Sequence, residues 1–245
     1  MIKKIVAIGG GENGRIKSDG TYSPYETKQI DMEIINLTEK KHPNFLFLGH
    51  SQNDINSEES YFHVMQNIYG NIFGCECQTI KKHELKDNIY KVQQLINWAD
   101  IIYEGGGDTK GMLELWLENC WFKTCSSDSL KLQLKDNTAP MISLNCLNFI
   151  NAFFTPHCNV SNSNTNRLQH MKESLKNSNL VGLGMSNCCA IEIIDDKYRL
   201  LTEDASNYNI ESYGIKTYWK DNKYIEKYID KSNTFKSLAD LLSKN

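Results

Sequence analysis

Short apolar runs alternate with longer amphipathic stretches through the first half of the chain. The apolar runs, rich in β-branched residues, predict buried strands at residues 2–8, 45–49, 72–80 and 100–104. The amphipathic stretches between them predict helices at residues 25–40, 57–69, 84–97 and 109–123. This alternation indicates βαβ units, and therefore a parallel sheet covered by helices on both faces.

The pattern changes after about residue 180. Four short apolar segments, VGLGM, CCAIEII, KYRLL and YGIKTYW, are separated by turn residues and predict antiparallel strands at the sheet edge. The polar stretches 124–138 and 159–179 are expected to form loops followed by helices. We therefore predict an α/β fold with a three-layer, doubly wound, mostly parallel sheet and C-terminal antiparallel strands, in one domain spanning residues 1–245.

Composition narrows the range of partners. The chain has 245 residues and a formal net charge of -3, so nothing favours binding to nucleic acid or to an anionic membrane. The eight cysteines form no paired CxxC motifs, and no apolar run is long enough for a membrane helix, so we expect a cytoplasmic protein with reduced thiols. No cofactor or metal is expected, because four histidines lie on separate elements without ligand spacing: His42, His50, His63 and His83.

The first glycine-rich loop, Gly9 to Gly14, satisfies the pattern G-x-G-x-x-G directly after a strand. A dinucleotide site would need a helix that opens inside the motif and an acidic residue about 20 positions further on. Here a polar loop, Arg15 to Pro24, intervenes, and the second strand ends too late. The context favours a substrate-facing loop at a strand end over a dinucleotide site.

The second glycine-rich loop follows the strand DIIYE and runs Gly105-Gly106-Gly107-Asp108-Thr109. Backbone N–H groups of glycines at a helix start can face a bound oxyanion, although a plain strand-to-helix turn is the alternative. Further along, His157 follows an apolar strand and a rigid proline, which suits a positioned general base. Asp128, in the polar segment Cys125 to Ser129, is either a turn residue or a partner for that base.

Together these segments resemble the dipeptidase E family of serine peptidases, whose wider relatives include cyanophycinase. The resemblance rests on six segments: IVAIGGGENG, FLFLGHSQND, ADIIYEGGGDTKGMLELW, ENCWFKTCSSDSL, FFTPHCN and GLGMSNCCAIEIIDDKYRLL. It implies a class I glutamine amidotransferase-like fold and hydrolysis of peptides, with a preference for N-terminal aspartate in the dipeptidases. It also implies roles for His157 as the base, Asp128 as its acid, and Gly105, Gly106, Gly107 and Asp108 as the oxyanion and substrate segment, with Gly106 central.

One part of the family pattern is missing. The family carries a nucleophile elbow, G-x-S-A-G, before the segment that resembles Asn119 to Phe122, and no G-x-S-x-G occurs in this chain. The missing piece amounts to roughly 25 residues, the size of one strand and one helix. The weak substitutes are Cys120, which the pattern places late in a helix, and Ser51 and Ser143, which lack the glycine elbow.

The loss has structural and functional consequences. The missing strand would lie at the sheet centre, so we expect either a gap, which a second copy of the chain could cover, or replacement by residues 139–144 or 149–154. The expected function is that of a serine-type dipeptidase with lost or impaired catalysis. The alternative is a noncatalytic protein that binds acidic small molecules or peptide termini. A truncated product without function and a nicotinamide-dependent enzyme remain as weaker hypotheses.

Overall fold

The computed structural model describes residues 3–15, 17, 19–116, 122–145, 148–162, 165–203 and 211–245. Its N-terminal half alternates strands and helices as the hydrophobic pattern predicts. In chain order the elements are β1 (Lys4–Ile8), α1 (Lys28–Asn36), β2 (Asn44–Leu48), α2 (Ile55–Met65), the π-helix η1 (Gln66–Ile72), β3 (Glu76–Ile80), α3 (Glu84–Asp87), α4 (Ile89–Trp98), β4 (Ile101–Glu104) and α5 (Thr109–Leu115).

The C-terminal half begins with β5 (Phe122–Ser127) and is richer in strands. The remaining elements are α6 (Ser129–Leu134), β6 (Ile142–Asn145), β7 (Ile150–Thr155), β8 (Ser161–Asn162), β9 (Thr165–Asn166), α7 (Arg167–Leu175), β10 (Val181–Met185), β11 (Cys189–Ile194), β12 (Lys197–Thr202), β13 (Gly214–Lys220), β14 (Lys223–Ile229), β15 (Lys236–Ser237) and α8 (Leu238–Leu242). The α/β fold class is therefore confirmed.

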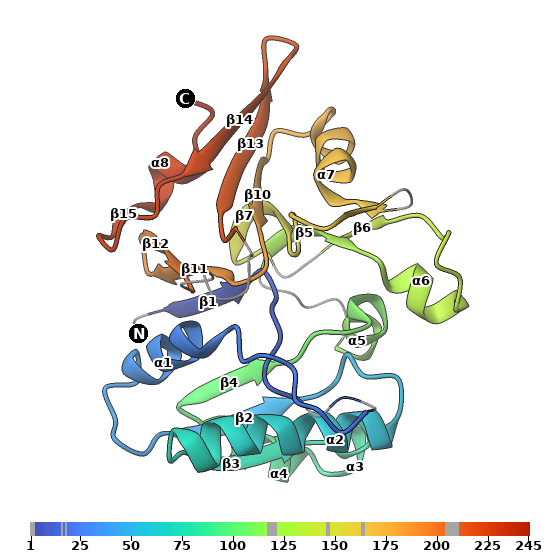
Figure 1. Ribbon diagram of the computed structural model, residues 1–245, viewed down its shortest axis with the longest axis vertical. Helices are drawn as coiled ribbons and strands as arrows, with labels where there is room; N and C mark the ends of the chain where they lie inside the picture. Colours follow the sequence, from blue (N-terminus) through green and yellow to red (C-terminus); the bar gives the residue numbers. More distant parts are fainter. Residues whose placement is uncertain are drawn as a thin grey trace.

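One end of the molecule is a parallel three-stranded sheet, ordered β3-β2-β4. Strand β2 is apolar along its whole length because both of its faces are buried. Phe45 and Phe47 pack into one core with α1 and α2, whereas Leu46 and Leu48 pack into another with α4. Figure 1 shows these helices on the two sides of the sheet.

The other end is a six-stranded sheet, ordered β14-β13-β10-β7-β5-β6. Strands β5, β7 and β10 are parallel, and the flanking β6, β13 and β14 pair antiparallel. The β13–β14 hairpin projects from the top of the view in Figure 1. The expected C-terminal antiparallel strands are thus present, in this sheet and in the third one.

The third sheet, ordered β1-β11-β12-β15, lies between the two ends. Successive residues of β1 point to opposite faces, as in any strand. Ile5 and Ala7 join the core of the C-terminal half, whereas Val6 and Ile8 join the core shared with β2 and α1. The antiparallel pair β1–β11 therefore links both hydrophobic cores.

Among the described strands, the parallel ladder of hydrogen bonds ends at β4. In the sequence, β4 lies shortly before the point where the family pattern would place the elbow. Among the described strands, β4 pairs only with β2. The expectation that residues 139–144 or 149–154 fill this place is wrong, because β6 pairs with β5, and β7 lies between β5 and β10. Ile102 of β4 is 48% exposed, which is unusual for a strand that normally lies inside a parallel sheet.

Several predicted boundaries also change. The helix predicted at 109–123 ends at Leu115, and residues 122–127 form β5 instead of the predicted loop. The helix predicted at 84–97 is divided at Asn88, whose side chain accepts from the Lys91 N–H at 3.2 Å and caps α4. The helix predicted at 57–69 continues into η1, so β3 begins only at Glu76.

The central role of β11 leads to a stability prediction. Ile191 is fully buried in the C-terminal core, and Ile191→Ala would leave a cavity there. We expect a loss of about 2–5 kcal/mol in the free energy of unfolding. Urea unfolding followed by circular dichroism measures it, with exposed Ile96→Ala as the control. A broad wild-type transition without cooperativity would instead favour the hypothesis of a nonfunctional truncated product.

Candidate functional site

His157 lies just after β7, in a backbone conformation that is uncommon for non-glycine residues, with φ of 51°. The backbone N–H of His157 donates to the Gly9 carbonyl at 2.7 Å, which ties the end of β7 to the end of β1. A Cβ atom on Gly10 would lie 2.1 Å from Cε1 of the imidazole, and Gly10 has φ of 122°. The first glycine loop therefore makes room for the His157 ring.

The ring of His157 is held by Asn187, which follows β10. Nδ1 lies 2.7 Å from Oδ1 of Asn187. Because an amide oxygen only accepts, Nδ1 carries the proton and Nε2 is left as the acceptor. Burial lowers the pKa of His157, and the Arg167 charge acts in the same direction, against the Asn187 bond and the Asp128 charge. The ring is therefore a neutral base near pH 7.

Asp128 lies between β5 and α6, near enough to influence His157 electrostatically. Its carboxylate accepts from Nη2 of Arg167 at 2.6 Å. The described hydrogen bonds contain none between Asp128 and His157. The role of Asp128 as the acid partner of His157 remains a prediction, and its observed partner is the arginine at the start of α7.

The loop from Gly105 to Asp108 is bonded to the segment that follows β2. Carbonyl oxygens of Gly105 and Gly106 accept from the side chains of Ser51 and Gln52, each at 2.6 Å. Gly107 has φ of 151°, and a Cβ there would lie 2.4 Å from the Ser51 carbonyl oxygen. A Cβ on Gly106 would meet open space, which suits the predicted oxyanion position. The oxyanion role itself remains a prediction.

Asp108 caps α5. Its carboxylate accepts from the Gly111 N–H at 3.1 Å and from Nε2 of Gln133 at 2.8 Å. Burial opposes ionisation, but these hydrogen bonds outweigh it and hold the pKa of Asp108 below its ordinary value. The carboxylate therefore caps the N-terminus of α5. It also holds α5 to α6.

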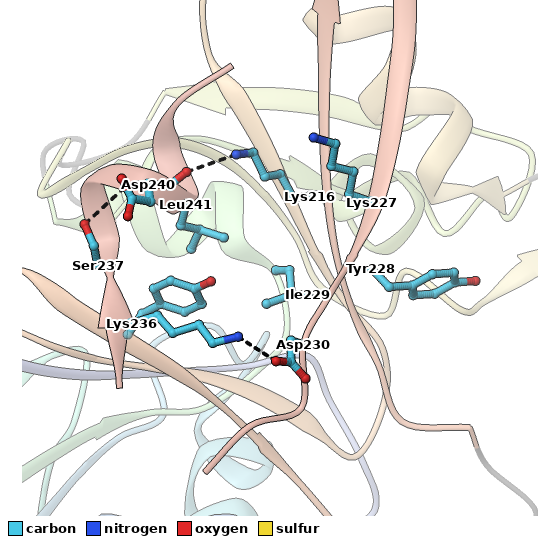
Figure 2. A pocket seen from close by; sticks show the side chains of 10 residues that line it. Lys216, Lys227, Tyr228, Ile229, Asp230, Lys236, Ser237, Asp240 and Leu241 are labelled. Atoms are coloured by element: carbon cyan, nitrogen blue, oxygen red, sulfur yellow. Dashed lines mark hydrogen bonds and ion pairs between the residues drawn. The ribbon is translucent and has the colours of Figure 1, made fainter. Parts of the chain in front are cut away.

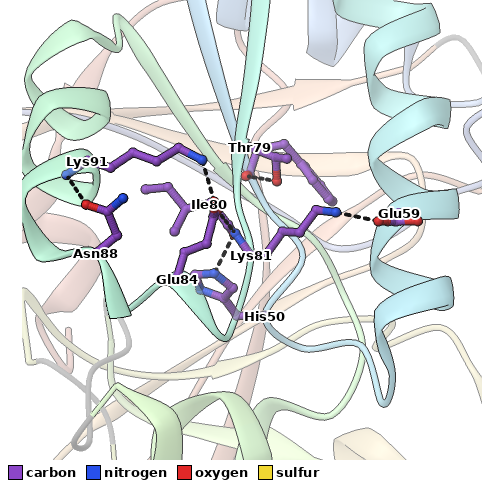
Figure 3. A network of polar contacts seen from close by, with 9 residues as sticks. His50, Glu59, Thr79, Ile80, Lys81, Glu84, Asn88 and Lys91 are labelled. Atoms are coloured by element: carbon purple, nitrogen blue, oxygen red, sulfur yellow. Dashed lines mark hydrogen bonds and ion pairs between the residues drawn. The ribbon is translucent and has the colours of Figure 1, made fainter. Parts of the chain in front are cut away.

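The two described substitutes for the nucleophile, Ser51 and Ser143, already have hydrogen-bond partners. Ser51 is 3% exposed and donates to the Gly105 carbonyl. Its neighbour His50 uses both ring nitrogens, with Nε2 at 2.8 Å from the Ile80 carbonyl and Nδ1 at 2.8 Å from Nε1 of Trp116. Figure 3 shows His50 below the end of β3, where Lys81 and Lys91 pair with carboxylates of α2 and α3. Ser143 faces solvent on β6 beside Ser174, and Cys120 lies outside the described residues.

The sequence reasoning missed a polar cluster beside His157. Oγ of Ser126 lies 3.0 Å from both Nδ1 of His170 and Oγ1 of Thr155. His170 follows Arg167 by three residues, so both lie on one face of α7. A polar face on α7 at this spacing was the available signal, whereas Asn187 gave none because asparagine is abundant in the chain. Ser126 is 3% exposed.

Other kinds of site find no support. In the described part of the chain, no three His, Cys, Asp or Glu side chains are grouped as a metal site. No helix among the described residues is long and apolar enough to cross a membrane. The six described cysteines are free, and burial raises the pKa of the Cys188 thiol to about 12, so this thiol stays protonated.

Comparison with known proteins assigns the scaffold. The crystal structure of a peptidase from an acI-B1 Actinobacterium superposes with a TM-score of 0.62 over 97% of each chain, at 15% identity. The two chains therefore share their fold. The sequence model of peptidase family S51 matches residues 15–119 and 118–201. The chain therefore belongs to peptidase family S51, the dipeptidase E family.

A curated relative agrees with this assignment. The uncharacterized peptidase YgaJ of Bacillus subtilis is 25% identical over 184 residues, which cover 64% of this chain and 69% of the relative. The two regions matched by the family model meet at residues 118–119, where the sequence lacks the G-x-S-x-G elbow.

The Asn187 contact predicts the ionisation of His157. We expect the Nδ1–H tautomer at neutral pH, with a titration midpoint below the ordinary value of about 6.5. Asn187→Ala should lower this pKa further, because the bond favours the protonated ring. Asn187→Asp should raise it, because a carboxylate stabilises the imidazolium. Two-bond ¹H–¹⁵N NMR of the imidazole measures both, with exposed Asn36→Ala as control. A dominant Nε2–H tautomer would contradict the assignment.

The close approach of Gly10 predicts a local effect of adding one methyl group. Gly10→Ala should displace the His157 ring and change its imidazole signals. The control, Gly20→Ala, has φ of 81° but meets no atom within 4 Å. It should cost only the backbone strain of about 1–2 kcal/mol. Equal losses of unfolding free energy in both variants, with unchanged His157 signals, would show that the ring does not depend on Gly10.

Proposed function

We propose that this protein binds acidic dipeptides at the His157 site and has lost the hydrolysis from which its family takes its name. The ancestral activity would be that of a serine-type dipeptidase that prefers N-terminal aspartate. The observation that supports the proposal is that one buried hydrogen-bond donor of Arg167 has no acceptor among the described residues. This residue is 7% exposed, and its Nε has no partner among the described residues.

A buried guanidinium is costly unless its donors meet acceptors. Asp128 supplies one acceptor, at Nη2, whereas the buried Nε has no acceptor among the described residues. Arg167 is close enough to His157 and His170 to lower the pKa of both rings. A ligand carboxylate at Nε would complete a charge-assisted pairing. A donor on the same ligand, such as an amine or amide N–H, would match Nε2 of His157.

The loss of hydrolysis follows from the chemistry of the missing elbow. A serine peptidase needs an activated hydroxyl and the N–H group that follows it in the oxyanion hole. The Ser51 hydroxyl donates to the Gly105 carbonyl, the Ser143 hydroxyl lies beside that of Ser174, and both residues lie outside a G-x-S-x-G turn. Loss of the nucleophile alone reduces kcat on the order of a millionfold in a serine protease. The binding half of the reaction does not require it.

Two measurements on the purified chain test the proposal. Calorimetry should detect binding of an Asp-X dipeptide, with affinity reduced about tenfold or more for the isosteric Asn-X dipeptide, because a charge-assisted bond is lost. Arg167→Gln should remove this preference, and its melting curve shows whether the variant is folded. An amine-release assay should detect no hydrolysis of either dipeptide.

Two results would contradict the proposal, one concerning the loss of hydrolysis and the other the recognition of acidic dipeptides. Turnover that disappears in His157→Gln, together with labelling by a serine-reactive phosphonate, would establish an active enzyme. Equal affinity for Asp-X and Asn-X would rule out recognition of the acidic side chain.

A further inference from the structure

Most charged side chains outside the His157 site have a direct partner. In the hollow between the β13–β14 hairpin and α8, Lys236 forms an ion pair with Asp230, and Lys216 donates to a backbone carbonyl of α8 (Figure 2). Two carboxyl groups in the N-terminal half are less well matched. They belong to Glu58 of α2 and to Glu104, the last residue of β4.

Both carboxyl groups lie around the end of β2. Glu104 is in register with Leu48, the last residue of β2. The next residue, Gly49, packs against Glu58, because a Cβ there would lie 2.9 Å from its Cγ. Glu58 is 3% exposed. Each carboxyl has one buried oxygen without a hydrogen-bond partner among the described residues, Oε1 of Glu58 and Oε2 of Glu104. A buried acceptor without a donor is costly, so both groups lack part of what would stabilise a charge.

The basic side chains near this pair have other partners. Three of them face Glu58 from the segment that follows β3: Lys81, Lys82 and His83. Figure 3 shows that Lys81 is paired with Glu59, and Nζ of Lys82 donates to the Gln52 carbonyl. The described ion pairs contain none that involves Glu58 or Glu104.

Burial dominates the ionisation of both groups. It raises the pKa of Glu58 and that of Glu104, although the charge of Lys82 opposes it at each. Hydrogen bonds from Ser51 also oppose it at Glu104, whereas the Glu58 charge raises the pKa of Glu104 further. Tyr61 is a further neighbour of Glu104 from α2, and burial raises the pKa of its hydroxyl, so it stays neutral.

Glu104 is joined to the second glycine-rich loop, Gly105 to Thr109, through the segment that follows β2. Its Oε1 accepts from the Ser51 backbone N–H at 3.3 Å. The Ser51 carbonyl accepts from the Asp108 N–H at 2.8 Å, and the Ser51 hydroxyl donates to the Gly105 carbonyl at 2.6 Å. Because Glu104 also directly precedes Gly105, movement of its carboxyl group into water would displace the start of this loop.

We propose that Glu104 keeps its proton at neutral pH, so that the Glu58–Glu104 pair carries at most one negative charge, and that loss of this proton releases the second glycine-rich loop. Two ionised carboxylates here would be buried like charges, which water stabilises better than the protein does. The Glu104 carboxylate would then leave its buried position and carry the start of the loop with it. The proposal does not depend on whether the His157 site binds a dipeptide.

Opening of the loop should become easier as the pH rises. In the open form the Glu104 carboxyl is solvated and loses its proton near the ordinary value of about 4.3. The closed form holds the proton to higher pH. The equilibrium constant for opening therefore rises about tenfold per pH unit above that value, until Glu104 ionises in the closed form as well. Glu104→Gln, which is isosteric and uncharged, should abolish this rise.

Hydrogen–deuterium exchange of a peptide that covers the loop tests the switch. Wild type and Glu104→Gln are compared at equal pH between about pH 5 and pH 8, so that the intrinsic pH dependence of amide exchange cancels. We expect the ratio of the wild-type rate to the variant rate to rise about tenfold per pH unit. Exposed Glu76→Gln removes the same charge from β3 and should behave as wild type. A constant ratio, or the same change in Glu76→Gln, would overturn the proposal.

A second measurement does not require a variant to fold. Carboxyl ¹³C NMR of wild-type protein labelled at glutamate should show a protonated carboxyl at about pH 7. This signal should be absent from Glu104→Gln. A wild-type spectrum in which every glutamate is ionised at that pH would overturn the proposal. So would a protonated signal that persists in Glu104→Gln, because the proton would then lie on another glutamate.

Discussion

The antiparallel pairing of β1 with β11 is the constraint on which the rest of this structure depends. Five residues of β1 are in register with β11, from Lys4 opposite Ile194 to Ile8 opposite Ala190. Because both strands alternate their side chains between two cores, neither half of the molecule can close its core without this pair. The same pair delivers Gly9 to the carbonyl contact that holds His157. Fold stability and site geometry are therefore coupled through β1.

This coupling also explains how the chain can accommodate the loss of a central strand. A continuous parallel sheet depends on every strand, and a missing one exposes two rows of backbone groups. Here the strands are divided among separate sheets, and the four-stranded and six-stranded sheets share one hydrophobic core. Among the described strands, β4 pairs only with β2, and its Ile102 is 48% exposed. The two glycine loops follow β1 and β4, and His157 follows β7.

The sequence correctly predicted those strands whose position depends on the local pattern of residues. Apolar runs located β1 to β4, and the glycine loops and the Pro-His element identified the ends of β1, β4 and β7, where the candidate site residues lie. The strand β5 was missed because its residues, Phe-Lys-Thr-Cys-Ser-Ser, are mostly polar and owe their conformation to pairing with β6 and β7. Asn187 and Arg167 were missed for a related reason. Their importance comes from which side chains they meet across the fold, and no spacing in the sequence encodes those contacts.

The residues around His157 affect its strength as a base, which matters for catalysis in addition to the missing nucleophile. In a serine peptidase triad, a buried carboxylate stabilises the imidazolium that forms when the base takes a proton. Here the atom at Nδ1 is a neutral amide oxygen, and the nearby carboxylate of Asp128 is bonded to the Arg167 cation, which itself disfavours the imidazolium. The surroundings of His157 thus favour the neutral ring, with its proton on Nδ1, over the imidazolium. His157 is therefore a weaker base than a triad histidine whose Nδ1 faces a carboxylate.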